Sequence, residues 1–316
     1  MRLLLIMLLF TVIVRGGKSL APVVVIGATG RVGRQVVKQL VSQGVETRCL
    51  VRDEEKAQMQ DCLHGAMLFK GDVTDLSSLM AVTEGAGAVI DCHGVNPPRL
   101  TKVTDLFTHP RHLLDSPYTI NFLGTKRVIA AMSMNGVGKL VRVTGALTGR
   151  SAFLLPVAIF NLLLSMTCKW HERSEIAIRE SGIDYTVIRP TGIRDELPAR
   201  ESGRCLVLIA GDSDETAKLP GKISLRDVAE LCVASLKEAR LSKATVVVSS
   251  AEGEGHSDWT PLIAHATSDQ WPLKRRWHEL PVGLLSLTLM AMASLASRAV
   301  AILSSAALRT IRARFT

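Results

Sequence analysis

The sequence has few aromatic residues, and its cysteines form no CxxC pair. Phe, Trp and Tyr make up 4% of the 316 residues. Because no basic stretch is interleaved with them, the sequence offers little support for a nucleic-acid-binding surface. The six cysteines are scattered and lie mostly in apolar runs, which is typical of free thiols in a reducing compartment. The same scatter predicts no metal site.

The N-terminal apolar run is too short to cross a bilayer. Met1 and Arg2 precede about 12 apolar residues, fewer than the ~20 that a spanning helix needs. Residues 1–21 are therefore assigned to a targeting segment. Ser19-Leu20-Ala21-Pro22 also resembles the cleavage site of two-part plastid leaders in algae with complex plastids. A plastid location would suit free cysteines, and the secretory pathway or ER membrane is the alternative.

At the other end, residues 261–316 form a predicted tail. Leu280 to Ser297 has no charged residue, and Arg298 and Arg309 recur with serines at helical spacing. An amphipathic helix lying on a membrane fits this pattern, so we predict peripheral membrane contact through residues 280–316. A helix packed on the protein's own core, or on a protein partner, fits equally well.

Between these ends, residues 22–260 have the composition of one domain with a large core. The chain is 47% hydrophobic, and its length does not require a second core. Val23, Val24, Val25 and Ile26 are typical of a strand buried on both faces of a parallel sheet. An apolar helical face follows and ends at Gly44.

A glycine-rich turn connects this strand to this helix. Its residues are Gly27, Ala28, Thr29, Gly30, Arg31, Val32 and Gly33. Glycines at such a turn let the backbone approach a pyrophosphate, and the helix N-terminus offers unpaired N–H groups to it. The strand–turn–helix context therefore predicts a dinucleotide site.

The next predicted strand, Thr47 to Val51, ends at Arg52 rather than at an acidic residue. An Asp or Glu there would accept a hydrogen bond from the adenosine ribose 2′-hydroxyl, whereas an Arg suits a 2′-phosphate. Arg31 can supply a second guanidinium group. The sequence thus favours NADP(H) over NAD(H). The alternative is that Arg52 is a solvated member of a charged run.

Several segments in order along the chain resemble one family. They are Gly27-Ala-Thr-Gly-Arg-Val-Gly33, Cys49-Leu-Val-Arg-Asp53, Gly71-Asp-Val73, Ala88 to Gly94, Asn121 to Thr125, Leu140 to Thr144, Lys169 to Pro190, and Ile223 to Ala229. On these segments the chain resembles the atypical short-chain dehydrogenase/reductases, particularly NmrA-like plastid and cyanobacterial members. The resemblance spans roughly Pro22 to Trp259.

This resemblance implies an α/β fold: a Rossmann-type, doubly wound parallel sheet with a small C-terminal substrate-side region. The apolar tail beyond the resemblance adds a predicted hydrophobic C-terminal helix. The alternation of strands and helices agrees with that architecture. The resemblance also implies cofactor contacts beyond the glycine turn. Asp72 and Val73 would contact the adenine, Gly94 the phosphate–ribose turn and Thr144 the nicotinamide end. Pro190 and Thr191 would lie at the edge of the nicotinamide pocket.

The chain departs from the family's catalytic pair, a Tyr four residues before a Lys. Aligned on the segment from Ser181 to Thr186, the Tyr position falls on Thr167 and the Lys position on His171. A Thr hydroxyl titrates too high for acid catalysis near neutral pH, but His171 is suitable. The alternative is that His171 lies on the helix surface or contacts the ribose. Lys169 is the other candidate for the role of the family's Lys.

Three functions remain open on these residues. The first is an NADP(H)-dependent oxidoreductase for an unidentified small organic substrate, with Thr144, Thr167 and His171 as candidate catalytic residues. The second is a scaffold or assembly factor that binds NADP(H) without turnover. The third is a structural partner tethered to a membrane. The segment from Thr191 to Pro220 shows no charge or aromatic pattern that would identify a substrate.

Overall fold

The computed structural model describes residues 21–95, 116–150, 157, 167–211 and 221–270. The predicted leader, the 280–316 helix and nearly all of the segment from Phe153 to Met166 lie outside these ranges. Within them, no helix has both the length and the apolar character needed to cross a membrane.

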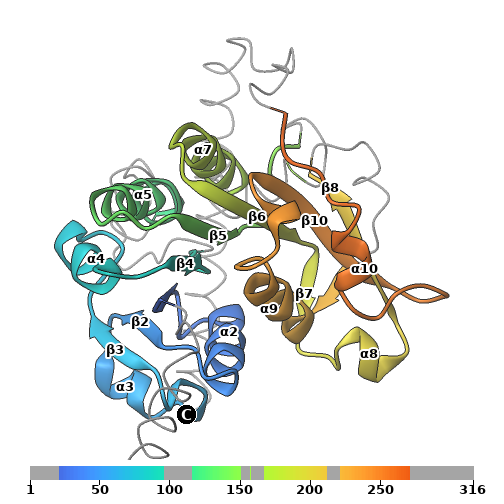
Figure 1. Cartoon of the computed structure of the whole chain (residues 1–316), viewed down its shortest axis with the longest axis horizontal. Coiled ribbons are helices and arrows are strands. Elements are labelled where there is room, and N and C mark those ends of the chain that lie inside the picture. The colour runs from blue at the N-terminus through green and yellow to red at the C-terminus, as the bar shows by residue number, and fades with distance from the viewer. Residues whose placement is uncertain (1–20, 96–115, 151–156, 158–166, 212–220, 271–316) are drawn as a thin grey trace, which may run out of the picture.

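An eight-stranded sheet forms the centre of the molecule (Figure 1). Its order is β3-β2-β1-β4-β5-β6-β10-β8, and every neighbouring pair is parallel except β10 with β8. The strands are β1 (Val23–Ile26), β2 (Thr47–Val51), β3 (Met67–Lys70), β4 (Ala88–Asp91), β5 (Lys139–Val143), β6 (Asp184–Pro190), β8 (Cys205–Ala210) and β10 (Ala244–Ala251). A separate parallel pair is formed by β7 (Gly192–Arg194) and β9 (Lys222–Ser224).

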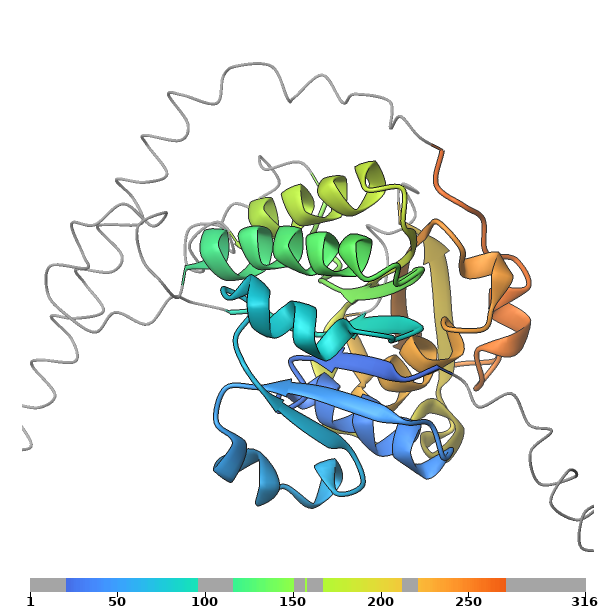
Figure 2. The same ribbon diagram turned by 60° about the vertical axis from the view of Figure 1, so that its left-hand side comes forward.

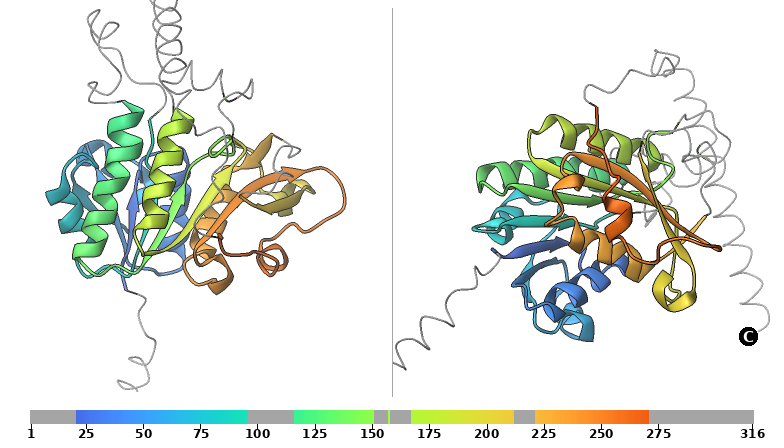
Figure 3. Two further views of the ribbon diagram at one scale, coloured as in Figure 1. Left: turned by 90° about the horizontal axis from the view of Figure 1, so that it is seen from above. Right: turned by 45° about the vertical axis from the view of Figure 1, so that its right-hand side comes forward.

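Helices cover both faces of the sheet (Figure 2). One face carries α2 (Arg31–Ser42) and α9 (Leu225–Ala234), and the other carries α4 (Leu76–Thr83), α5 (Thr125–Met134) and α7 (Thr167–Glu180). Helices α5 and α7 run side by side (Figure 3, left). A π-helical stretch, η4 (Tyr118–Gly124), leads into α5 and contacts α7. The shorter helices are α3 (Glu54–Gln58), α8 (Ala199–Ser202), α10 (Thr260–Ile263), η1 (Asp61–Leu63) and η6 (Ala239–Leu241).

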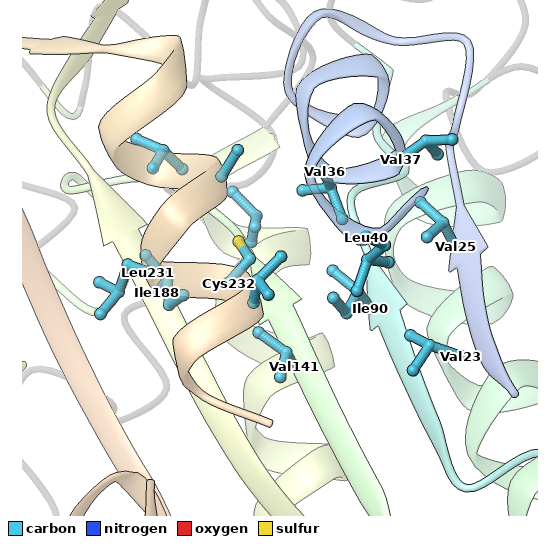
Figure 4. Packing of buried hydrophobic residues seen from close by; sticks show 14 of the residues in the cluster. Val23, Val25, Val36, Val37, Leu40, Ile90, Val141, Ile188, Leu231 and Cys232 are labelled. Carbon is cyan, nitrogen blue, oxygen red and sulfur yellow. The ribbon is translucent and has the colours of Figure 1, made fainter. Parts of the chain in front are cut away.

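Two apolar clusters hold the layers together, one on each face of the sheet. Val36 and Leu40 of α2 lie near Val25 and Ile90, and Leu231 of α9 lies beside Ile188 (Figure 4). Because successive strand residues point to opposite faces, neighbouring residues in β5 join different clusters. Val141 and Val143 face α2 and α9, and Leu140 faces the α4–α5–α7 layer. Arg142 therefore points into that second layer, where it is fully buried.

The predicted fold class is confirmed, because the sheet is mostly parallel and doubly wound. One half continues from β1 to β2 and β3, and the other half continues from β4 to β5 and β6. The folded unit extends beyond residue 260, where we placed the start of the tail. Ile263 is buried, and Asp269 accepts hydrogen bonds from Tyr185, Arg179 and Thr245. Tyr185 in β6 points into the interior and is 3% exposed.

All six cysteines are free, and four of them are buried. Cys49, Cys168, Cys205 and Cys232 lie in the interior as small apolar side chains. Burial raises the pKa of the Cys49 thiol to about 12, which keeps it protonated. This agrees with the predicted absence of a disulfide framework.

Candidate cofactor site

The chain reverses its winding direction between β1 and β4. Strands β2 and β3 follow on one side of β1, and β5 and β6 follow on the other side of β4. In doubly wound sheets, ligands bind outside the carboxyl ends of the strands at this switch point. The predicted cofactor residues lie at that edge, each just beyond or at the end of a strand: Gly27 to Gly33 after β1, Arg52 after β2, Asp72 and Val73 after β3, Gly94 after β4, Thr144 after β5, and Pro190 and Thr191 at β6.

The turn after β1 has room for backbone only. Gly27 has φ +76°, and a Cβ there would lie 2.8 Å from the backbone of Cys92 and His93. A Cβ at Gly33 would lie 2.1 Å from the Gly27 carbonyl oxygen. The Gly30 N–H donates to that same oxygen at 2.9 Å, which closes the turn. Glycine is thus required by the close approach of turn, helix and β4.

Helix α2 begins without a side-chain cap and without an acidic residue in its first turn. Its first N–H groups have no partner within the helix, and its dipole is positive at this end. Gly30 is exposed beside them, and a Cβ there would meet only the Gly27 oxygen, at 3.1 Å. This cradle, which a side chain would fill, fits the pyrophosphate of a dinucleotide.

The two predicted phosphate-binding arginines, Arg31 and Arg52, are both exposed. Neither forms an ion pair with any residue that the structure describes. The nearest carboxylate to Arg52 in sequence, Asp53, is occupied as the N-cap of α3. It accepts the Lys56 N–H at 3.1 Å and pairs with Lys56 Nζ at 2.9 Å. These bonds lower the pKa of Asp53, and both guanidinium groups are left for a ligand.

At the end of β3, Asp72 is held by its own turn. Its carboxylate accepts hydrogen bonds from the backbone N–H and the hydroxyl of Thr74, both at 2.8 Å. Val73 is buried, and a Cβ at Gly124 would lie 3.1 Å from its side chain. Asp72 and Val73 therefore lie at the carboxyl edge of the sheet, at the predicted adenine position.

Asn121 on η4 brings the predicted catalytic pair together. Its Oδ1 accepts the Val95 N–H at 3.0 Å, which identifies the other amide atom as the donor. Asn121 Nδ2 then donates to Thr167 Oγ1 at 3.2 Å and to His171 Nε2 at 3.3 Å. Gly94 lies beside them, since a Cβ there would be 3.9 Å from His171 Cε1.

The His171 ring is neutral at neutral pH. Burial, followed by the positive charge of Arg142, lowers the pKa of His171 to about 3. Because Nε2 accepts from Asn121, the ring carries its proton on Nδ1. His171 therefore contributes a hydrogen-bond acceptor at Nε2. Its predicted part in proton transfer, and that of Thr167, stay predictions.

Thr144 belongs to a second buried network. Its hydroxyl donates to Glu175 Oε1 at 2.7 Å. Glu175 also accepts from Arg189, with Nε at 3.1 Å and Nη2 at 2.5 Å, and from Arg179 at 3.3 Å. Burial alone would raise the pKa of Glu175, but Arg189 and Arg179 lower it to about 2. Sequence reasoning missed Glu175 and Arg189. Arg189 is a charge within a largely apolar strand, but nothing distinguishes Glu175 from the other charged residues of α7.

A third group joins β4 to β5, and its Asp91–Arg142 pair was also missed. Asp91 at the end of β4 pairs with Arg142 of β5 at 2.8 Å, and both side chains are fully buried. His93 contacts both Asp91 and Arg142 through Nδ1 and donates from Nε2 to the Ile120 carbonyl at 2.9 Å. Burial would raise the pKa of Asp91, but the Arg142 and His93 charges lower it below its usual value.

The remaining predicted residues lie around this edge. Lys169 on α7 places its ammonium 5.6 Å from the Trp170 ring centre. Thr191 donates its hydroxyl to Ser249 at 3.0 Å, which ties the end of β6 to β10. Pro190 is buried in β6 and accepts the Ala146 N–H at 2.9 Å.

Solved structures share this fold at low sequence identity. A putative NAD-dependent epimerase/dehydratase from Bacillus halodurans superimposes with a TM-score of 0.59 at 17% identity, covering 77% of this chain and 99% of that one. A short-chain dehydrogenase/reductase from Veillonella parvula, solved in complex with NADP, superimposes with a TM-score of 0.55 at 14% identity, covering 75% and 98%.

Curated relatives are more similar in sequence. The chloroplastic protein TIC 62 of Arabidopsis thaliana is 28% identical over 82% of this chain, which spans 38% of that longer protein. Sanguinarine reductase of Eschscholzia californica is 29% identical over 77% of this chain and 94% of its own length. Photosystem II assembly factor Ycf39 of Cyanidium caldarium is 29% identical over 69% and 62%.

The model of a protein family described as NAD(P)H-binding matches residues 27–239. This match begins at the glycine turn directly after β1 and ends after α9, so it includes the turn and the strands from β2 to β9. Together with the fold and with relatives of the same kind, it shows that the chain belongs to the NAD(P)H-binding family, as an atypical short-chain dehydrogenase/reductase-like protein.

Proposed function

We propose that the chain binds NADP(H) in preference to NAD(H) and acts as an oxidoreductase on a small organic substrate. The observation that carries the cofactor preference is the state of Arg31 and Arg52. Two exposed guanidinium groups at the ends of the glycine turn and β2 suit a dianionic 2′-phosphate. The carboxylate that would select a free 2′-hydroxyl is replaced by Arg52, and Asp53 is occupied by α3.

The nicotinamide cofactor, when bound, supplies a hydride donor or acceptor. The chain's own residues bind and orient it. The turn after β1 and the start of α2 take the pyrophosphate, Gly94 leaves space beside His171, and Asn121 fixes Thr167 and His171. The relative named as a reductase covers most of this chain at 29% identity, which supports turnover.

A second function, NADP(H) binding without turnover in an assembly role, is favoured by one observation. The Tyr–Lys pair of the family is replaced by Thr167 and a neutral, buried His171 whose Nε2 is already occupied by Asn121. A relative named as an assembly factor supports this alternative. In this role the chain would bind an unidentified protein partner and contact a membrane through residues 280–316. It would not bind nucleic acid.

We further propose a plastid location, reached through the leader in residues 1–21. The chloroplastic relative supports it, and so does a chain whose six cysteines are all free. A fluorescent fusion to the full chain, compared with one that lacks residues 1–21, tests the leader. Signal in the secretory pathway would contradict the plastid proposal.

Calorimetric titration with NADPH and NADH tests the cofactor preference. We expect NADPH to bind at least ~10-fold more tightly, because one charge-assisted phosphate contact contributes about that much. Turnover is tested separately, by following NADPH absorbance against a panel of carbonyl, enone and iminium compounds. His171→Ala should lower any turnover by ~100-fold if His171 assists proton transfer. A panel without NADPH consumption, despite tight binding, would favour the assembly role.

A further inference from the structure

Buried polar atoms without a partner gather at one place in the molecule. Among the residues that the structure describes, six buried side-chain nitrogen or oxygen atoms lack a hydrogen bond. Four of the six are Asp91 Oδ2, Arg142 Nε, Arg142 Nη2 and His171 Nδ1. Such atoms are rare in folded proteins, because each one left unpaired costs the free energy of its desolvation. A group of four therefore points to a polar occupant.

The three residues lie on the same face of the sheet, near its carboxyl edge. Asp91 and Arg142 are directly paired across β4 and β5. Their side chains point into the α4–α5–α7 layer, as Val89 and Leu140 do two residues earlier. His171 reaches this layer from α7, and its ring is joined through Asn121 to η4, whose Ile120 carbonyl also accepts from His93.

The unpaired atoms of Arg142 form one edge of its guanidinium group. Its Nη1 is occupied by Asp91 Oδ1 at 2.8 Å and contacts His93 Nδ1 at 3.0 Å. The Nε and Nη2 hydrogens point in parallel from the opposite side, in the geometry that binds two oxygen lone pairs. Asn121 fixes the His171 proton on Nδ1, so His171 adds a third N–H donor to this group.

The fourth atom decides which kind of molecule fits. Asp91 Oδ2 is a carboxylate oxygen, and it requires a hydrogen-bond donor. An anion would satisfy the three N–H groups but would leave Asp91 Oδ2 unpaired and repelled. Water both donates and accepts, and buried waters make about three hydrogen bonds to groups of this kind.

We propose that Asp91, Arg142 and His171 enclose ordered water, which accepts from the Nδ1–H that the Asn121 amide selects on His171. The consequence extends to the predicted nicotinamide end of the edge. The Asn121 amide, oriented by the Val95 N–H, directs Nδ2 toward both His171 Nε2 and Thr167 Oγ1, and the water supports the opposite side of the His171 ring. Asp91 and Arg142 are then positioning residues, which act on the Thr167–His171 pair through water. The hydration site does not depend on whether the chain turns over.

Imidazole NMR of the full chain tests the tautomer. Long-range proton–nitrogen correlations distinguish Nδ1–H, Nε2–H and doubly protonated rings. We expect His171, assigned with His171→Gln, to be neutral and Nδ1-protonated at pH 7. His93 is the internal control, since its Nε2 donates to the Ile120 carbonyl. An Nε2–H or doubly protonated His171 would overturn the proposal.

A crystal structure that shows ordered water tests the occupant directly. We expect density within hydrogen-bonding distance of Asp91 Oδ2, the Arg142 fork and His171 Nδ1. Direct contact among these side chains, with no density between them, would overturn the proposal, as would an anion. Arg142→Lys keeps the charge but removes the fork, so it should displace the water while Asn121 keeps the His171 proton on Nδ1. The same change at Arg48 in β2 is the control and should leave the water in place. An Arg142→Lys protein that keeps the water would refute the role of the fork.

Discussion

The two ends of the predicted cofactor site, at the carboxyl edge of the sheet, consist of different chemical groups. At the phosphate end, the contacts are backbone N–H groups, glycines without side chains and two exposed arginines. At the nicotinamide end, they are buried ions and amides from four elements, β4, β5, η4 and α7. Both ends lie at the carboxyl edge of one sheet. Substitutions at the first end are limited by the space for added atoms, and substitutions at the second end are limited by the need to balance buried charges.

This difference determines how each end responds to substitution. Gly27 and Gly33 tolerate no added atoms, but the charge at this end is carried by side chains in solvent, which are individually dispensable for stability. A buried ion pair tolerates a change of partner poorly, because the remaining charge is left without compensation in a medium of low polarity. The predictions below contrast the two ends, starting from the largest effect.

Glu175→Gln should cause the largest loss of stability. The substitution keeps the shape of the side chain but leaves the buried Arg189 and Arg179 without their carboxylate. We expect the free energy of unfolding to fall by about 3–5 kcal/mol, as for other broken buried ion pairs. Urea denaturation measures it. Glu252→Gln is the control, since the Glu252 side chain is 90% exposed and its loss should change stability little. An equally small change in Glu175→Gln would show that the buried network is dispensable.

Gly30→Val should abolish tight nucleotide binding without unfolding the protein. A Cβ at Gly30 meets only one atom, at 3.1 Å, yet the added methyl groups would occupy the pyrophosphate cradle. We expect NADPH affinity to fall by ~100-fold or more, with the unfolding free energy changed by less than about 1 kcal/mol. Titration and urea denaturation separate the two effects.

Two other glycines calibrate this result. Gly33→Ala places a methyl group 2.1 Å from the Gly27 oxygen, so it should lose stability as well as binding. Gly138, with nothing within 4 Å of a Cβ, is the matched control, and Gly138→Val should keep full NADPH affinity. Retained binding in Gly30→Val would mean that the cofactor lies elsewhere.

The strand, turn and helix of the predicted phosphate end could be predicted from sequence, because their signals are local. The run Val23 to Ile26, the glycines and the helix that ends near Gly44 are consecutive, and each has a distinct physical signal. The structure places β1, the turn and α2 at these residues. Arg31 and Arg52 are exposed at the predicted edge.

The nicotinamide end could not be predicted in the same way, because its contacts join residues far apart in the chain. Thr144 and Glu175 are separated by 31 positions, and Asn121 and His171 by 50. Arg142 looks like the outward residue of an alternating strand, yet it is fully buried against Asp91. The pairing of Thr167 with His171 was accessible only through the family resemblance, and Asn121, which joins them, was not identified as a site residue.

The pH dependence of stability should reveal His171. Its pKa is about 3 in the folded protein against an ordinary 6.5, so the unfolded chain binds a proton that the folded one does not. The stabilisation is complete above pH 6.5 and is lost as the pH falls from there toward 3. Relative to His171→Gln, we expect the wild type to lose about 1.5 kcal/mol between pH 6.5 and 5. The raised pKa of Asp227, about 6 because of burial, acts in the opposite direction in both proteins and cancels in the comparison. Parallel curves for the two proteins would show that His171 takes up its proton in the folded protein at the same pH as in the unfolded chain.

The smallest effect is expected at the exposed arginines, where it also tests the cofactor preference most directly. Arg52→Ser and Arg31→Ser should each weaken NADPH binding by ~10-fold, because each removes one charge-assisted contact to the 2′-phosphate. NADH affinity should stay the same, since NADH has no phosphate at that position. Arg34 is the matched control, because it is exposed on α2 one turn further from the cradle, and Arg34→Ser should leave both affinities unchanged.

The NADPH advantage should also shrink as salt concentration rises, since solvent ions screen exposed charges far more than the buried pairs at the nicotinamide end. Equal losses for NADPH and NADH in Arg52→Ser would show that this arginine contacts a part shared by both cofactors, and the preference would then need another source.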